Sequence, residues 1–153
     1  PVRVMLSPGH TLASVTYVVN EDAAFVHDTF MQPDAGTARA DFPGGSARIL
    51  YGSLMRLLAL DDQTRLFVGH DYGTESRDDP AWEATVAEQR AKNIHVGGGV
   101  PEADYIRLRE ARDATLGLPD RILFALQVNL RGGRLPEPEA DGHSYFRIPA
   151  NRF

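Results

Sequence analysis

The sequence contains no cysteine. This excludes a disulfide framework, a thiolate nucleophile and a cysteine-ligated zinc site, so any metal ion must be held by His, Asp or Glu. No apolar run approaches the roughly 18 residues that span a bilayer. The 16 basic and 21 acidic residues give a formal charge of −5, without the clustered Lys and Arg that nucleic-acid binding requires. We therefore expect a cytoplasmic protein that binds neither membranes nor nucleic acid.

The remaining composition is that of an ordinary globular protein. Hydrophobic residues make up 42% and charged residues 24% of the 153 residues, which is enough apolar material to form a buried core. No repeat or linker divides the chain. Residues 1–153 are therefore predicted to form a single domain.

Short apolar runs bounded by turn residues, above all those rich in β-branched and aromatic residues, are typical of strands. Four such runs occur, at Val2–Leu6, Ala13–Val19, Ala23–Val26 and Arg65–Val68. A loop dense in Pro and Gly follows the third run. Strands interleaved with the helices described next indicate a mixed α/β domain.

Three segments are predicted to be helical. Between Ser46 and Leu60, apolar residues recur three and four positions apart and form one stripe. The stripe consists of Ile49, Leu50, Leu54, Leu57 and Leu58. The other two helices are predicted over Asp79–Asn93, with Asp79 as the N-cap and Pro80 at the first helical position, and over Glu102–Leu116. The tail from Arg131 onward, rich in Gly, Pro and Glu, is expected to cover the surface with little regular structure.

Three candidate metal ligands lie at strand ends. His10 stands in the break Ser7–Thr11, Asp28 follows the strand Ala23–Val26, and His70 follows the strand Arg65–Val68. Loops at strand ends place side chains on a rigid scaffold, and imidazole and carboxylate groups are common metal ligands. Each residue also has a structural reading. His10 would be a turn histidine bonded to a backbone carbonyl, Asp28 would be an Asx-turn cap, and His70 would be a structural histidine or one that lies near the site without binding a metal.

The segments around these three residues resemble the ordered ligand motifs of the metallo-β-lactamase superfamily. The segments are Pro8-Gly9-His10-Thr11, Val26-His27-Asp28-Thr29 and Gly69-His70-Asp71-Tyr72. Arg39-Ala40-Asp41-Phe42 resembles the Arg-x-Asp-Phe signature of the glyoxalase II-like branch that contains persulfide dioxygenases. The segments 88–93 and 127–131 also resemble that branch, and the chain is similar to bacterial β-lactamase-like hydrolases linked to sulfide detoxification.

The resemblance implies the αββα four-layer sandwich of that superfamily, with a part missing. Family members carry an upstream His-x-His-x-Asp-His motif that this sequence lacks. We therefore expect the chain to correspond to the C-terminal half of the sandwich, as a fragment or as part of a longer protein. The missing segment would supply the remaining ligands.

In the persulfide dioxygenase branch one ferrous ion is held by two histidines and one aspartate, which leaves positions open for substrate and O₂. The resemblance assigns two of these ligands to His10 and Asp28. His70 matches the ligand of a second metal in binuclear hydrolases, and lies near the iron without binding it in the mononuclear enzymes. Tyr72 is expected to hydrogen-bond a metal-bound water or the substrate, or else to be a half-buried structural tyrosine.

Further residues receive supporting roles. Arg39 and Asp41 are expected to pair and to order the loop beside the site. Arg90 and Asn129 are the candidates for binding glutathione. For Arg90, a position on a solvent-exposed helix face without any role in binding is an equal alternative. His27 neighbours a ligand, whereas His95 and His143 are expected at the surface.

These residues lead to three functional hypotheses. The first is an iron-dependent dioxygenase that oxidises glutathione persulfide to sulfite. The second is a glyoxalase II-type thioester hydrolase with two metals, including zinc. The third is a non-catalytic module that keeps the fold. Both enzyme hypotheses imply a glutathione-derived substrate, and the resemblance suggests a homodimer.

Overall fold

The computed structural model describes residues 1–151 and folds as two compact units. The first unit comprises Pro1–Thr115, and the second begins at Leu116. Within the described part of the chain, none of the helices is long and apolar enough to cross a membrane.

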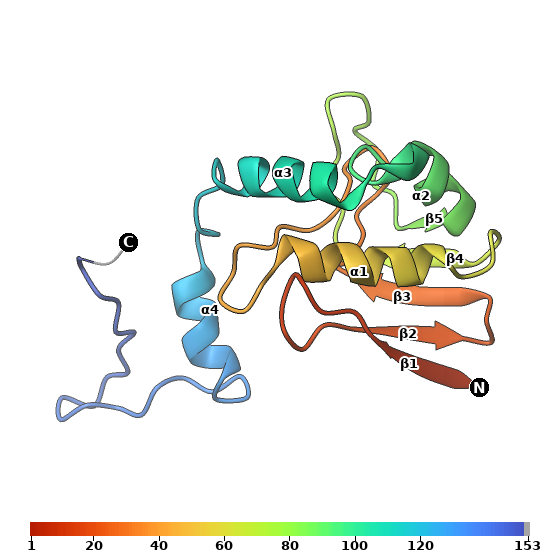
Figure 1. The fold of residues 1–153 in the computed structure, drawn as a ribbon. Coiled ribbons are helices and arrows are strands. Elements are labelled where there is room, and N and C mark those ends of the chain that lie inside the picture. Colours follow the sequence, from red (N-terminus) through yellow and green to blue (C-terminus); the bar gives the residue numbers. More distant parts are fainter. Residues whose placement is uncertain (152–153) are drawn as a thin grey trace. The chain divides into compact units, whose positions relative to one another are not determined.

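The first unit is built on a five-stranded mixed sheet with the strand order β1-β2-β3-β4-β5 (Figure 1). The strands are β1 (Val2–Leu6), β2 (Val15–Val19), β3 (Ala23–His27), β4 (Arg65–Val68) and β5 (Glu83–Thr85). Neighbouring strands are antiparallel except β3 and β4, which are parallel and are connected through helix α1 (Ala47–Leu58). The predicted strands are thus confirmed, with β2 beginning two residues later than expected.

Helix α1 packs against one face of this sheet, and the core lies between them. Leu50, Leu54, Leu57 and Leu58 of the predicted stripe are buried with apolar strand residues such as Val18 and Leu66. Full burial of such a side chain contributes about 1.5–3 kcal/mol. Ile49 is 45% exposed, so its prediction as a member of the buried stripe is wrong.

The other face of the sheet carries apolar side chains that remain exposed. Tyr17 and Phe25 pair across β2 and β3, and Phe25 pairs with Phe67 of β4. The Phe25 and Phe67 rings stack with their centres 5.2 Å apart. Tyr17 and Phe25 are each about half exposed, as are Val2 and Val4 at the sheet edge. This face forms one wall of the pocket described below.

The predicted helix Asp79–Asn93 is wrong in its first half. Residues Glu83–Thr85 form β5 antiparallel to β4, and helix α2 comprises only Val86–Lys92. Thr85 caps α2 in a capping box with Glu88, whereas Pro80 lies in the preceding loop. The reason is tertiary: the edge of β4 offers backbone hydrogen bonds that a helix over residues 79–85 would leave unmade.

Helix α3 (Glu102–Asp113) is three residues shorter than predicted and follows the turn η1 (Gly97–Gly99). It contributes Tyr105 to the core and buries two charged residues, Arg109 and Asp113. His95, expected at the surface, is instead partly buried, with its ring against Gly36 and Thr37. Its Nδ1 accepts a hydrogen bond from the Thr37 backbone N–H at 2.9 Å, a bond that only an unprotonated Nδ1 can accept.

This burial predicts an acid-sensitive fold. Burial, together with the nearby guanidinium groups of Arg109 and Arg112 and against the opposing carboxylate of Asp113, lowers the pKa of His95 from 6.5 to about 4. A lowered folded-state pKa means that the unfolded chain binds the proton more readily, so stability is complete above pH 6.5 and is lost as the pH falls toward 4. We expect a loss of about 2 kcal/mol across this range, after allowance for the partly exposed ring.

Chemical denaturation at a series of pH values measures this effect. The variant His95→Asn should flatten the profile between pH 6.5 and 4, whereas the exposed control His143→Asn should leave it unchanged. A wild-type profile that is already flat in this window would contradict the prediction.

The second unit contains helix α4 (Ile122–Asn129), which the sequence analysis did not predict. The tail after it has no helix or strand within residues 131–151, as expected. The tail contacts α4: the Gln127 side chain and the Arg147 backbone exchange two hydrogen bonds of 3.3 and 3.0 Å, and Phe124 meets Phe146 edge to face.

Candidate metal centre

The loop that carries His10 is fixed directly onto helix α1. Gly9 adopts a φ of 134°, and a Cβ atom built on it would lie 2.3 Å from the Cα of Leu50. The Ser53 hydroxyl donates to the Pro8 carbonyl at 2.6 Å, and the Ser46 N–H donates to the Gly9 carbonyl at 2.9 Å. Only glycine permits so close a backbone approach at this φ, so Gly9 sets the place from which His10 projects.

The His10 ring is oriented by a backbone carbonyl. Its Nδ1 lies 2.8 Å from the Arg39 carbonyl oxygen. Because that oxygen can only accept, Nδ1 carries the proton, and a neutral ring therefore presents a free lone pair on Nε2. The ring also packs on Phe42, with centres 5.4 Å apart. This contact agrees with the reading of His10 as a carbonyl-bonded turn histidine and leaves Nε2 available for the predicted role as a metal ligand.

Asp28 lies where a bulge ends β3. The register with β4 shifts between Phe25 and His27, and His27 adopts a φ of 51°. A positive φ at a non-glycine residue is strained and is concentrated at functional sites. The bulge brings the Asp28 carboxylate next to His10, with His10 Nε2 3.6 Å from Asp28 Oδ2.

Two more histidines surround the Asp28 carboxylate. His27 Nδ1 lies 3.0 Å from Oδ2, and His70 Nε2 lies 3.3 Å from Oδ1 on the other side. Asp28 Oδ1 is nevertheless buried without a hydrogen-bond partner. A buried oxygen with no hydrogen bond costs about 1–3 kcal/mol and is the kind of atom that a cation would satisfy.

A clamp of charged residues fixes the loop after His70. Arg77 pairs with Asp71 and with Asp34, at 2.5 and 2.9 Å. Hydrogen bonds from Arg77 hold the pKa values of both carboxyls below their usual range. Tyr72, in the same loop, is largely exposed and stacks on the His70 ring with centres 5.7 Å apart.

The chemical types of these side chains suit a metal ion, but the side chains do not form a complete set of ligands. Imidazole nitrogens and a carboxylate oxygen are the ligands that iron and zinc take in proteins, and the Asp28 oxygen without a hydrogen bond, Oδ1, lies 3.3 Å from His70 Nε2. Among residues 1–151, however, no three His, Asp or Glu side chains are arranged to hold a metal by themselves. A metal ion at Asp28 would therefore need a further donor or a shift of these side chains.

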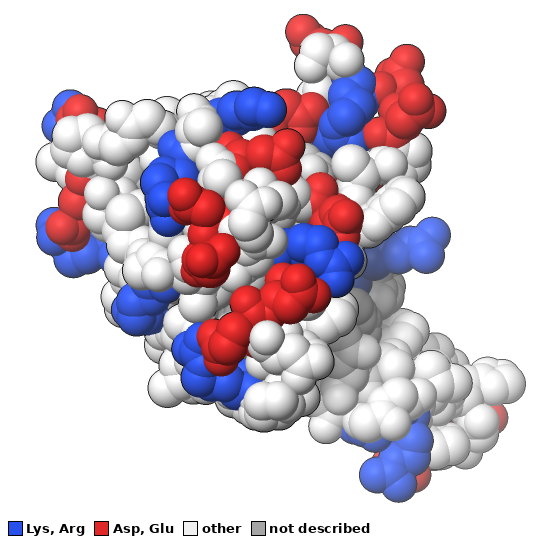
Figure 2. Space-filling view, turned by 90° about the vertical axis from the view of Figure 1, so that its right-hand side faces the viewer, with Lys and Arg blue, Asp and Glu red and all other residues white. Residues whose placement is uncertain are grey.

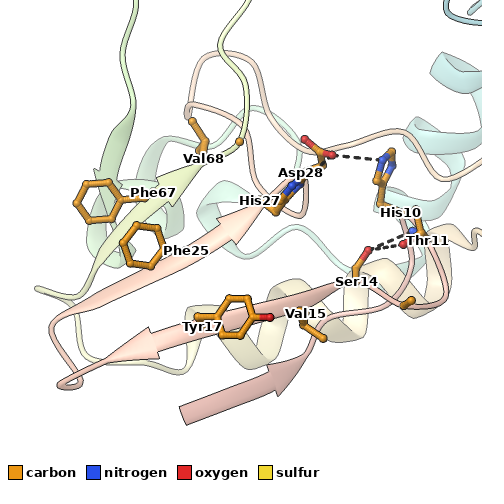
Figure 3. Close-up of a pocket in the computed structure, with 12 residues that line it drawn as sticks. His10, Thr11, Ser14, Val15, Tyr17, Phe25, His27, Asp28, Phe67 and Val68 are labelled. Carbon is orange, nitrogen blue, oxygen red and sulfur yellow. Dashed lines mark hydrogen bonds and ion pairs between the residues drawn. The ribbon is translucent and has the colours of Figure 1, made fainter. Parts of the chain in front are cut away.

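A pocket of about 490 Å³ opens beside this cluster (Figure 3). One end is polar and carries His10, Asp28 and His27. The opposite end is the aromatic sheet face with Phe25 and Phe67. The pocket therefore joins a set of metal-ligating groups to an apolar wall, a combination typical of ligand sites.

The remaining predicted site residues lie in different places. Arg39 and Asp41 form the expected bidentate pair, with two contacts of 2.6 Å, and the Arg39 guanidinium lies over the Phe42 ring. Arg90 pairs with Asp62 and donates to the Leu58 carbonyl.

Arg90 does not line the pocket beside Asp28, and Asn129 belongs to the second unit. Their predicted roles in substrate binding remain predictions. Arg77, Arg109 and Asp113 were not predicted from the sequence. Arg109 and Asp113 stand at the four-residue spacing of a helical ion pair, but the residues of the 34–40 segment that these side chains contact lie far away along the chain, so no local motif marks them.

Charge on the surface is mixed. On the face shown in Figure 2, acidic and basic side chains lie side by side and neither sign forms a continuous field. The absence of nucleic-acid and membrane binding, like the proposed homodimer, remains a prediction.

No protein-family model matches this chain. The chain is 61% identical over 149 residues to a beta-lactamase hydrolase-like protein of Xylella fastidiosa, covering 97% of this chain and 34% of that protein. It is 48% identical to a probable metallo-hydrolase of Burkholderia pseudomallei, covering 97% of this chain and 53% of that protein.

Among solved structures, the fold is similar to that of ETHE1 from Myxococcus xanthus. The TM-score is 0.75 at 31% identity, and the match covers 87% of this chain and 54% of that one. The chain thus spans between a third and about half the length of the relatives it matches. The sheet and helices of the first unit are part of a metallo-β-lactamase fold.

Proposed function

Because this chain belongs to the metallo-β-lactamase superfamily, in its glyoxalase II/ETHE1-like branch, we propose that it forms part of an iron-dependent persulfide dioxygenase. The reaction oxidises the terminal sulfur of glutathione persulfide to sulfite and releases glutathione. Each turnover consumes one O₂ and one water: the sulfur loses four electrons, and O₂ accepts them.

One observation carries this proposal: the mutual orientation of His10 and Asp28. The Arg39 carbonyl holds His10 Nδ1, so that Nε2 points toward a carboxylate with an unsatisfied buried oxygen. A histidine and a carboxylate directed at one point are two of the three ligands of the 2-His-1-carboxylate arrangement. The Arg-x-Asp-Phe segment 39–42, which supplies that carbonyl, resembles the dioxygenase branch.

Bound ferrous iron would supply the electron transfer between sulfur and O₂. The residues of this chain would hold the ion, orient its ligands and shield the reacting sulfur from water. His10 and Asp28 would hold the ion, and the aromatic wall of Phe25 and Phe67 would keep water from the persulfide sulfur. Exclusion of water strengthens the electrostatic interactions within such a site. Tyr72 and His70, whose rings stack, would offer a polar contact to substrate.

A second candidate is the binuclear thioester hydrolase, and one observation favours it. His10 and His70 lie against different oxygens of the Asp28 carboxylate. A carboxylate between two such histidines can bridge two metal ions, which together activate a water molecule for attack on an acylglutathione. In that case His70 is a ligand rather than a neighbour of the iron.

Oxygen uptake separates the two candidates. Full-length, metal-replete protein is expected to consume O₂ when glutathione persulfide is added and to contain one iron per chain. Hydrolysis of an acylglutathione without O₂ uptake, at two metals per chain, would replace the dioxygenase with the hydrolase. Absence of both activities and of bound metal would support the non-catalytic module.

The matched variants are His10→Ala and His143→Ala. The first removes the oriented donor and is expected to abolish iron retention, whereas the second removes an exposed histidine of the second unit and should leave iron content unchanged. Unchanged iron in the His10→Ala protein would refute the ligand assignment.

A further inference from the structure

Helix α3 carries an ion pair that is almost fully buried. Arg109 and Asp113 are 3% and 5% exposed, and Arg109 Nη2 lies 2.7 Å from Asp113 Oδ1. A buried pair of this kind gains little net stability over an apolar pair of the same shape, because desolvation offsets the attraction between the charges. Stability alone therefore does not explain why charges stand here.

Both members of the pair reach the same loop. Arg109 Nη1 donates to the Thr37 carbonyl at 3.0 Å, and Asp113 Oδ2 accepts from the Ala40 N–H at 2.8 Å. These two contacts bracket Arg39, whose carbonyl oxygen holds His10 Nδ1 at 2.8 Å. The carbonyl that orients His10 thus belongs to a stretch of backbone fixed on either side by one buried ion pair.

We propose that Arg109 and Asp113 are positioning residues for the metal ligand His10. The pair fixes the Arg39 carbonyl, and the carbonyl fixes both the proton on Nδ1 and the direction of Nε2. The inference rests on the proposed function only in taking His10 as a ligand. Neither residue lines the pocket beside Asp28, so each acts through the loop rather than on substrate.

The charges suit this role because of their geometry. The guanidinium fork gives Arg109 one arm for Asp113 and another for the Thr37 carbonyl, and the two carboxylate oxygens divide between Arg109 and the Ala40 N–H. Loss of a group that orients a ligand histidine typically lowers metal affinity by roughly 10–100-fold.

The test removes the pair as a unit. The double variant Arg109→Met with Asp113→Leu leaves no unpaired buried charge, so it is expected to fold. In the full-length protein its affinity for Zn²⁺ and Fe²⁺ should fall by roughly 10–100-fold. In the metal-free protein, ¹⁵N NMR of neutral His10 should show a smaller fraction of the Nδ1–H tautomer.

The matched control is Arg48→Gln with Glu102→Gln. It removes another ion pair that involves α3, at 2.5 Å, without touching residues 37–40. This control should leave metal affinity and the His10 tautomer unchanged. A folded Arg109–Asp113 double variant with wild-type affinity and tautomer would overturn the proposal.

Hydrogen exchange in the unsubstituted protein tests the proposal even where the double variant does not fold. The Ala40 amide should be strongly protected from exchange. If it exchanges at the rate of an unstructured loop, the proposed anchoring of residues 37–40 by the ion pair is wrong. The outcome is separable from that of the proposed function. If the unsubstituted protein takes up no O₂ but the double variant shows the tautomer shift at His10, the dioxygenase is refuted and the positioning role of the pair is retained.

Discussion

Replacing Asp28 with alanine is expected to abolish metal retention while leaving the metal-free fold intact. The carboxylate is the group on which His10, His27 and His70 converge, at 3.0 to 3.6 Å. Without it, the histidine nitrogens that remain have no anionic partner, and the affinity should fall by more than the roughly 10–100-fold lost with an orienting group.

The effect on stability should be small or favourable. Asp28 Oδ1 is buried without a hydrogen bond, and removal of such an atom relieves a cost of about 1–3 kcal/mol. We therefore expect the metal-free Asp28→Ala protein to unfold at a denaturant concentration no lower than that of the wild type. Lower stability would show that Asp28 is a structural cap rather than a ligand held ready for a cation.

His27→Ala is the matched control for Asp28→Ala. His27 also touches the Asp28 carboxylate, but its side chain is 72% exposed and projects from a strained backbone position. It is expected to lower metal affinity far less than Asp28→Ala. Metal content by elemental analysis, compared among the three proteins, measures the difference. Equal losses in both variants would make His27 a ligand.

Replacing Gly9 with alanine is the second change with a large expected effect. The new Cβ would lie 2.3 Å from Leu50 Cα and 2.4 Å from Leu50 N, both backbone atoms of α1. No side-chain movement relieves such a clash, and a φ of 134° is itself strained for alanine. We expect a loss of about 4 kcal/mol or more in the free energy of unfolding.

Gly98→Ala is the control, because Gly98 also has a positive φ but meets no atom within 4 Å. It should cost only about 1–2 kcal/mol, the strain of the left-handed conformation. Denaturant titration of both variants gives the comparison. If Gly9→Ala costs no more than Gly98→Ala, the loop does not lie against α1 as closely as the structure places it.

Gly9→Ala should also separate fold from function. Where the variant remains folded at low temperature, the loop must move away from α1 and take His10 with it. We therefore expect metal affinity to fall together with stability in Gly9→Ala, and stability alone to fall in Gly98→Ala.

Much of this protein follows from its sequence alone. The apolar runs at Val2–Leu6 and Arg65–Val68 are strands with the predicted bounds, and the leucine stripe lies on α1. The reason is that a period of two or of three to four residues is a local property that burial on one face preserves. The three ligand motifs were likewise visible, because each is a short contiguous segment.

Other features were decided by tertiary structure. Residues 83–85 became a strand because the edge of β4 lay free to pair with them, although their local pattern suited a helix. Ile49 adjoins the leucine stripe in sequence, yet it points outward because helix α1 buries only part of its circumference.

The site itself divides in the same way. The sequence supplied the candidate metal ligands, which are His10, Asp28 and His70. Only the folded chain decided that the Arg39 carbonyl orients His10, that a bulge leaves an Asp28 oxygen unsatisfied, and that α3 holds the intervening loop. These interactions join residues 29 to 73 positions apart. The chemical type of a candidate ligand can be read from single residues and short motifs. The orientation of its side chain depends on contacts between residues far apart along the chain, which no local pattern encodes.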